Sequence, residues 1–190
     1  MNLLKDRIIK DGVVIDNRIL KVDSFLNHQM DVKLFNEIGK EFKKKFEGQT
    51  VTKILTVETS GIAIAVIAAQ YFDVPVVFAK KTTGNNMDIL TYDAKVYSFT
   101  KDIEYTIKVS KKYINKDDKI LIIDDFLASG SAVSGLIDIV QKGKAKVCGV
   151  GIVIEKFFQN GRVGIIKKGI QLESLAVIES MKNGKVIFKD

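Results

Sequence analysis

The residues with the clearest chemical potential are two adjacent acids, Asp124 and Asp125, followed by a loop of small residues. Apolar residues at 120–123 precede the acids, which predicts a buried parallel strand that delivers them to its carboxyl edge, where open α/β sheets bind ligands. An apolar-periodic helix is predicted at 133–140, so the loop amides before it could hold an anion. The loop consists of Ala128, Ser129, Gly130, Ser131 and Ala132.

A carboxylate pair beside an anion-binding loop suits a ligand that carries hydroxyls or Mg²⁺ next to a phosphate. Carboxylates accept hydrogen bonds from a ribose diol, while loop amides and the hydroxyls of Ser129 and Ser131 hold a 5′-phosphate. An ordinary strand, turn and helix with a capping serine is the alternative interpretation. The sequence contains neither a Walker A lysine loop nor a GxGxxG fingerprint. The pattern therefore favours a sugar phosphate.

A second candidate anion site lies at residues 57–63, where a predicted strand ends just before a predicted helix. Ser60 and Gly61 offer amides there that could hold pyrophosphate, although a simple helix cap also explains these residues. Lys80 and Lys81 end the next predicted strand, where two cations could face a diphosphate or be solvated. Strands and helices alternate along the chain, which predicts a parallel sheet covered on both faces.

The segment KILIIDDFLASGSA, residues 119–132, resembles the signature of the type I phosphoribosyltransferases. In that family, apolar residues are followed by two acids, two apolar residues and a Thr/Gly-rich loop. Ser129 and Ala132 stand where the family usually has threonines, so one hydroxyl is kept and one is lost. Ala128 stands where hypoxanthine-guanine enzymes usually have an aspartate, proposed as the general base, so the familiar base is missing.

Four further stretches narrow the resemblance to the bacterial xanthine phosphoribosyltransferases, whose length and segment order match this chain almost end to end. They are LKVDSFLNHQMD from Leu20, VETSGIA from Val57, VPVVFAKK from Val74 and VGIVIEKFFQNGR from Val150. The resemblance implies an α/β fold with a mostly parallel central sheet flanked by helices. It also implies one domain over residues 1–190, with a small hood built from about residues 1–35 and 155–190.

The resemblance also implies an activity: transfer of the phosphoribosyl group of 5-phosphoribosyl 1-diphosphate (PRPP) to xanthine, with Mg²⁺ accompanying the diphosphate. Asp124 and Asp125 would orient the ribose. The loop at 128–132 would hold the 5′-phosphate. Pyrophosphate would be bound by Ser60, Gly61, Lys80 and Lys81, and the purine by Leu20, Asn27 and Lys156. Asn27 can pair with a 2-oxo group or a ring N–H, and Lys156 can donate to a 6-oxo group.

Two alternatives remain open at this stage. A guanine- or hypoxanthine-preferring enzyme would use the same lysine, so the 2-position near Asn27 decides the preference. A regulator that senses PRPP while binding nucleic acid is the other. The net charge of +7 is compatible with nucleic-acid binding, yet the lysines are spread along the chain without interleaved aromatic clusters. Small anionic substrates explain this charge better, and no nucleic-acid partner is expected.

Composition predicts one intracellular domain, because 190 residues with 46% hydrophobic content can bury a sizeable core. The single cysteine, Cys148, excludes a disulfide framework and fits the cytoplasm. No apolar run is long enough for a membrane span. A mobile lid is predicted at 82–93, an exposed hairpin at 94–100 and 104–109, and short strands at 171–188. By resemblance alone, we expect a homodimer.

Overall fold

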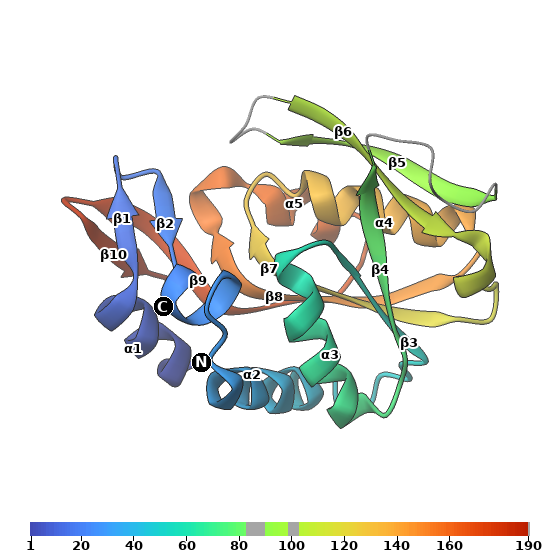
Figure 1. Ribbon diagram of the computed structural model, residues 1–190, viewed down its shortest axis with the longest axis horizontal. Coiled ribbons are helices and arrows are strands. Elements are labelled where there is room, and N and C mark those ends of the chain that lie inside the picture. The colour runs from blue at the N-terminus through green and yellow to red at the C-terminus, as the bar shows by residue number, and fades with distance from the viewer. Residues whose placement is uncertain (83–89, 99–102, 190) are drawn as a thin grey trace.

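The computed structural model describes residues 1–82, 90–98 and 103–189, and eight strands of these residues form one sheet. The strands are β3 (Lys53–Val57), β4 (Val76–Thr82), β5 (Thr91–Ser98), β6 (Ile103–Ser110), β7 (Lys119–Leu127), β8 (Lys146–Lys156), β9 (Leu172–Lys182) and β10 (Lys185–Phe188). Their order is β10-β9-β8-β7-β3-β4-β6-β5 (Figure 1). The run from β9 to β4 is parallel, and β10 and the β6–β5 hairpin extend it antiparallel at its two edges. The predicted mostly parallel sheet is confirmed.

Helices cover both faces of the sheet and complete three layers (Figure 1). On one face lie α2 (Val32–Lys45) and α3 (Ser60–Phe72), and on the other lie α4 (Ser131–Lys142) and α5 (Gly161–Lys167). The two hydrophobic cores correspond to these faces, one containing Ile38 and Phe42 of α2 and the other Leu136 of α4. The strands between them are buried on both faces, which explains their continuous apolar runs.

The boundaries of α2 show how local sequence sets an element. Asp31 is its N-cap, and the Asp31 carboxylate accepts a hydrogen bond from the Leu34 N–H at 3.1 Å. Phe35, Ile38 and Phe42 recur at helical spacing and are buried against the sheet. The Phe42 and Phe46 rings lie so close to β8 that a Cβ at Gly151 or Gly149 would collide with them.

The hairpin of β5 and β6 differs from the prediction of an exposed flap. β6 pairs with β4, so the hairpin continues the main sheet. Its alternating apolar residues are buried against α4, where a Cβ at Gly135 would meet Val96 and Ile107 side chains. An alternating pattern describes a strand with one buried face, and that face is part of the core here. Most of the predicted lid at 82–93 lies outside the described residues.

The chain termini meet at one end of the sheet. The N-terminal segment contains α1 (Asn2–Asp11), the strands β1 (Val13–Ile15) and β2 (Ile19–Lys21), and a π-helical turn (Asp23–Asn27). The Met1 ammonium donates to the Leu175 carbonyl at 2.7 Å, and the Asn17 side chain accepts from the Gly184 N–H at 3.3 Å. The tail forms one long parallel strand, β9, and a short β10, whereas sequence predicted only short strands.

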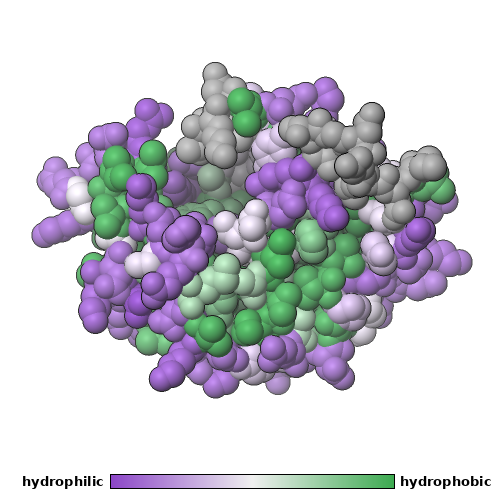
Figure 2. Space-filling view, in the orientation of Figure 1, coloured by the Kyte–Doolittle hydropathy of each residue, from purple (hydrophilic) through white to green (hydrophobic). Residues whose placement is uncertain are grey.

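One face of the molecule carries an apolar patch surrounded by hydrophilic residues (Figure 2). Figure 2 shows a continuous hydrophobic patch over α3 and β4. Val66 of α3 is 46% exposed and Phe78 of β4 is 37% exposed, and half-buried apolar side chains surround them. Helix α3, SGIAIAVIAAQYF, is apolar on all sides, so burying one side against the sheet leaves an apolar side outward. Within the described residues, no helix is long and apolar enough to cross a membrane.

Candidate active site

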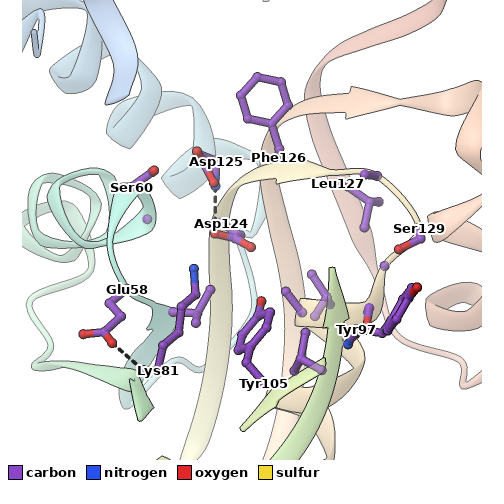
Figure 3. A pocket seen from close by; sticks show the side chains of 18 of the residues that line it. Glu58, Ser60, Lys81, Tyr97, Tyr105, Asp124, Asp125, Phe126, Leu127 and Ser129 are labelled. Atoms are coloured by element: carbon purple, nitrogen blue, oxygen red, sulfur yellow. Dashed lines mark hydrogen bonds between the residues drawn. The ribbon is translucent and has the colours of Figure 1, made fainter. Parts of the chain in front are cut away.

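A cavity of about 260 Å³ lies at the carboxyl edge of the parallel strands (Figure 3). Strand β7 delivers Asp124 and Asp125 to it, and the loop after β7 closes one side before α4 begins. Gly130 precedes α4 with a φ of 84°, a left-handed conformation that favours glycine. The lining consists of residues 57–61 and 124–133 with Lys81, Val96, Tyr97, Tyr105 and Gln159. Two predicted anion sites and the acid pair therefore share one cavity.

The two acids share one low-dielectric environment. Burial, followed by repulsion from Asp125, raises the pKa of Asp124 well above its usual range. Burial also raises the pKa of Asp125, while hydrogen bonds from Asp124 and Ser60 oppose that rise. The Asp125 N–H donates to the Asp124 Oδ1 at 3.1 Å. Burial therefore favours the protonated form of each acid more than in an exposed carboxyl group.

On the other side of the cavity, the end of β3 leads into α3. The Glu58 carboxylate accepts a hydrogen bond from the Lys81 backbone N–H and so ties the ends of β3 and β4 together (Figure 3). The peptide bond between Glu58 and Thr59 is cis. A Cβ at Gly61 would lie 2.1 Å from the Thr56 Oγ1 and 3.0 Å from the Asp124 Oδ1. Only glycine therefore lets α3 start this close to the acids.

The two lysines at the end of β4 separate, because successive side chains of a strand point to opposite faces. Lys81 lines the cavity, and its Nζ lies 5.3 Å from the centre of the Tyr105 ring. In Figure 3 both the Lys81 amine and the Tyr105 hydroxyl point toward Asp124. Burial, then the Asp124 charge, raises the pKa of Tyr105. Lys80 is exposed beside Phe78 and, among the described residues, is not part of the cavity wall.

The loop at 128–132 packs against elements to which the sequence pattern assigned no role. The Gly161 N–H donates to the Ala128 carbonyl at 3.1 Å, and a Cβ at Gly161 would lie 2.3 Å from that oxygen. The Ser131 Oγ accepts from the Tyr97 N–H at 3.0 Å, which joins α4 to β5. The signal for Gly161 was its place in the quoted VGIVIEKFFQNGR stretch. The contacts themselves join segments too distant in sequence for local patterns to pair them.

The three predicted purine-binding residues lie outside this cavity wall as the described residues form it. Leu20 is buried in β2, and Asn27 ends the π-helical turn with its Oδ1 buried and without a hydrogen-bond partner among the described residues. Lys156 ends β8, where its Nζ donates to the Arg18 carbonyl at 3.1 Å. The same Nζ lies 5.8 Å from the Phe126 ring, which does line the cavity. Burial lowers the pKa of Lys156.

The edge of this parallel sheet thus brings two acids, the loop before α4 and the start of α3 together in one cavity. Residues 22–173 match the family described as phosphoribosyl transferase domain, and the chain belongs to this family. The fold is similar to adenine phosphoribosyltransferase from Thermoanaerobacter pseudethanolicus, with a TM-score of 0.75, 18% identity, and coverage of 92% of this chain and 98% of that one. The adenine phosphoribosyltransferase from Giardia lamblia gives a TM-score of 0.77, with 18% identity and 92% and 96% coverage.

Within the family, the chain is similar to the bacterial xanthine phosphoribosyltransferases. It is 69% identical to the xanthine phosphoribosyltransferase of Clostridium tetani and 67% identical to that of Clostridium novyi. It is 60% identical to the enzyme of the same name from Ruminiclostridium cellulolyticum. Each of these alignments covers 100% of both chains. The resemblance predicted from sequence is therefore confirmed.

Proposed function

We infer that this protein is a xanthine phosphoribosyltransferase of purine salvage, which converts xanthine and PRPP to xanthosine 5′-monophosphate and pyrophosphate. The observation that carries this inference is the single cavity that joins the acid pair to the loop at 128–132 and to the start of α3. Full-length similarity to enzymes named for xanthine supports the same reaction.

We propose that three parts of the cavity divide PRPP between them. The loop amides and the Ser129 and Ser131 hydroxyls hold the 5′-phosphate at the start of α4. Asp124 and Asp125 accept hydrogen bonds from the ribose diol. The pyrophosphate lies at the start of α3, at Ser60 and Gly61, with the Lys81 amine beside it. Lys80, which is exposed, remains a predicted contact that would have to reach around its strand.

No protein nucleophile is needed for this transfer. As the bond from the anomeric carbon to pyrophosphate breaks, the sugar gains oxocarbenium character, and a ring nitrogen of the purine attacks the same carbon. The protein contributes by fixing the sugar and both anions in place and by stabilising the developing charges. The Asp124 and Asp125 carboxylates, when ionised, stabilise the positive sugar. No general base is assigned, because xanthine loses a proton near neutral pH and can react as an anion.

The oxygen donors of the cavity suit Mg²⁺, which prefers oxygen ligands and keeps several waters. We propose that Mg²⁺ enters the cavity bound to the diphosphate and that the Asp124 and Asp125 carboxylates then lie near it. When bound, Mg²⁺ would neutralise negative charge on the leaving pyrophosphate. Its charge would also lower the pKa values of the two acids, which burial raises, and so favour the ionised pair.

The proposed purine site adjoins the cavity at Phe126. Lys156 would donate to the 6-oxo group of the base, and its charge would favour anionic xanthine. Asn27 has a buried carbonyl oxygen without a partner among the described residues, and such an atom is suited to an N–H of the ligand. Leu20 would supply an apolar wall or backbone contacts. Lys156 adjoins the cavity through the Phe126 ring, whose centre lies 5.8 Å from the Lys156 Nζ.

We also propose a homodimer in the cytoplasm with no nucleic-acid or membrane partner. The apolar patch of α3 and β4 supports self-association, because exposed patches of this kind on folded domains commonly mark interaction sites (Figure 2).

The proposed cytoplasmic location rests on the substrate. PRPP carries several charges and does not cross a lipid bilayer unaided, so the reaction belongs where PRPP is made.

Pyrophosphate release tests the proposed function. The protein is incubated with PRPP and Mg²⁺, and xanthine, guanine, hypoxanthine and adenine are supplied in separate reactions. We expect kcat/KM for xanthine to exceed the others by at least about tenfold, or ~1.4 kcal/mol of transition-state preference. Preference for guanine or hypoxanthine would keep the class and overturn the purine assignment. Tight PRPP binding without turnover of any base would favour a regulator instead.

A further inference from the structure

An ion pair between a buried carboxylate and a partly exposed guanidinium lies beside the loop at 128–132. Glu155 of β8 is 1% exposed, and its Oε1 lies 3.5 Å from the Nε of Arg162 on α5. Its other oxygen accepts a hydrogen bond from the Ser174 hydroxyl of β9 at 2.5 Å. Among the described residues, Arg162 is the only cation at ion-pair distance from Glu155. The reaction proposed above uses neither member of the pair.

The position of this pair connects it to the loop. Glu155 pairs in the sheet with Leu127, the last residue of β7 before the loop. Arg162 directly follows Gly161, whose N–H donates to the Ala128 carbonyl. A Cβ at Gly130 would lie 2.8 Å from the Gly161 carbonyl oxygen, so the loop and the first turn of α5 are in close contact.

The ion pair therefore lies on the α5 side of the contact between this helix and the loop at 128–130. Helix α5 has only 7 residues, too few to hold its own position, and no side-chain cap hydrogen bond fixes its first turn. A buried carboxylate needs its cation, because an unpaired charge in a dry interior is costly. The attraction of Arg162 to Glu155 acts at 3.5 Å without a hydrogen bond to the Glu155 Oε1, and together with the buried Ile165 side chain it holds α5 against the sheet beside residues 128–130.

We propose that Glu155 and Arg162 are positioning residues for the 5′-phosphate of PRPP: through Gly161 they hold the loop at 128–130 in its anion-binding shape. This inference rests on the proposed function, since it assumes that this loop binds the sugar phosphate. The pair touches no reacting atom. Its effect is specific to one end of the substrate, because the proposed pyrophosphate site belongs to β3, α3 and β4 on the other side of the cavity.

Titration calorimetry with two separate probes, ribose 5-phosphate and pyrophosphate with Mg²⁺, tests the proposal. The variants are Arg162→Gln, which removes the cation, and the double variant Glu155→Gln with Arg162→Gln, which removes both charges, so that no buried charge is left alone. We expect both variants to weaken ribose 5-phosphate binding at least about tenfold and to leave pyrophosphate binding within about twofold. Arg162→Lys, which keeps the cation, should restore most of the affinity.

Lys45→Gln is the matched control. It removes another cation that lies 3.5 Å from a carboxylate, that of Glu173, on elements away from the loop, and it should leave both affinities unchanged. Equal losses for both probes, or unfolding of the double variant, would make the pair merely structural and overturn the proposal. Unchanged ribose 5-phosphate binding in both variants would overturn it as well. If the unaltered protein binds no ribose 5-phosphate, the proposed function fails first, and this inference fails with it.

Discussion

At the scale of single residues, Asp124 shows a conflict between stability and function. The acid is buried at 4% exposure beside a second acid, and burial together with that neighbour raises its pKa. A carboxyl group whose pKa is raised on folding binds more protons in the folded chain than in the unfolded chain. The free energy of unfolding therefore falls as the pH rises from the unfolded pKa through the folded pKa.

Asp124→Asn should therefore stabilise the protein while it abolishes turnover. Asparagine cannot ionise, so the variant escapes the loss of stability that the acid suffers with rising pH. We expect a Tm gain at pH 8 of at least about 2 °C, the shift that ~1 kcal/mol gives in a domain of this size, and a smaller gain at pH 5. We expect kcat to fall at least about 100-fold, because asparagine keeps only one neutral acceptor oxygen and lacks the negative charge that stabilises the oxocarbenium-like sugar.

Calorimetric scans at pH 5 and pH 8 measure the change in Tm, and a pyrophosphate-release assay measures the change in kcat. Asp117→Asn serves as the control, because it removes the same charge from an exposed position just before β7. A variant that retains wild-type turnover would remove the ribose assignment. A Tm lower than that of the unaltered protein at pH 8 would show that the Asp124 carboxylate stabilises the fold.

Lys156 gives a second prediction at this scale. Lys156→Ala should raise the KM for xanthine at least about tenfold and change PRPP binding by no more than about twofold, because Lys156 lies beside Phe126 rather than beside the loop at 128–132, where we propose that the 5′-phosphate binds. Steady-state kinetics with each substrate varied in turn give both values. Lys182→Ala is the control, since Lys182 ends the neighbouring strand β9 and is exposed. Equal losses for the two substrates would contradict the purine assignment.

At the scale of elements, the start of α3 depends on one glycine. A Cβ at Gly61 would overlap the Thr56 Oγ1 and crowd the Asp124 carboxylate. We expect Gly61→Ala to push α3 away from β7, to destabilise the protein by about 1–3 kcal/mol and to weaken pyrophosphate binding. Gly164→Ala on α5 is the matched control: nothing lies within 4 Å of its Cβ position, so alanine should be neutral or slightly stabilising. Thermal unfolding of both variants tests whether α3 requires glycine at position 61. Equal Tm values for the two variants would contradict that requirement.

Local patterns predicted the elements that bind the ligand better than the contacts between them. The apolar run at 120–123 predicted strand β7, although that strand continues past the acids to Leu127, and the apolar period at 133–140 predicted α4. The hairpin of β5 and β6 was read as exposed, because alternation cannot reveal which tertiary surface covers its apolar face. Lys80 and Lys81 point to opposite faces of the sheet because both belong to β4, in which successive side chains alternate. The sequence alone did not show that the strand extends over both residues. The support from Gly161 and Arg162 involves pairings across the sheet that only the folded chain brings together.

At the scale of the whole molecule, charge and apolar surface have different roles. The net charge of +7 creates a positive field that raises the encounter rate with a multiply charged substrate. Exposed lysines lie on helices of both faces of the sheet, such as α2 and α4, and on most strands, so the field is broad rather than confined to a groove for nucleic acid. The apolar patch on α3 and β4 has no such long-range effect. It acts only on contact, and we propose a second copy of this chain as the partner it contacts.

Val66→Lys should therefore convert a homodimer to a monomer, because a lysine in the middle of an apolar interface would lose its hydration without gaining a partner. Val66 lies at the centre of α3 and is 46% exposed. Val163→Lys is the matched control, since Val163 is 43% exposed on α5, on the opposite face of the sheet. Light scattering coupled to size-exclusion chromatography should give a monomer mass for the first variant and a dimer mass for the second. A dimer in both variants would place the interface elsewhere, and a monomeric unaltered protein would refute the proposed assembly.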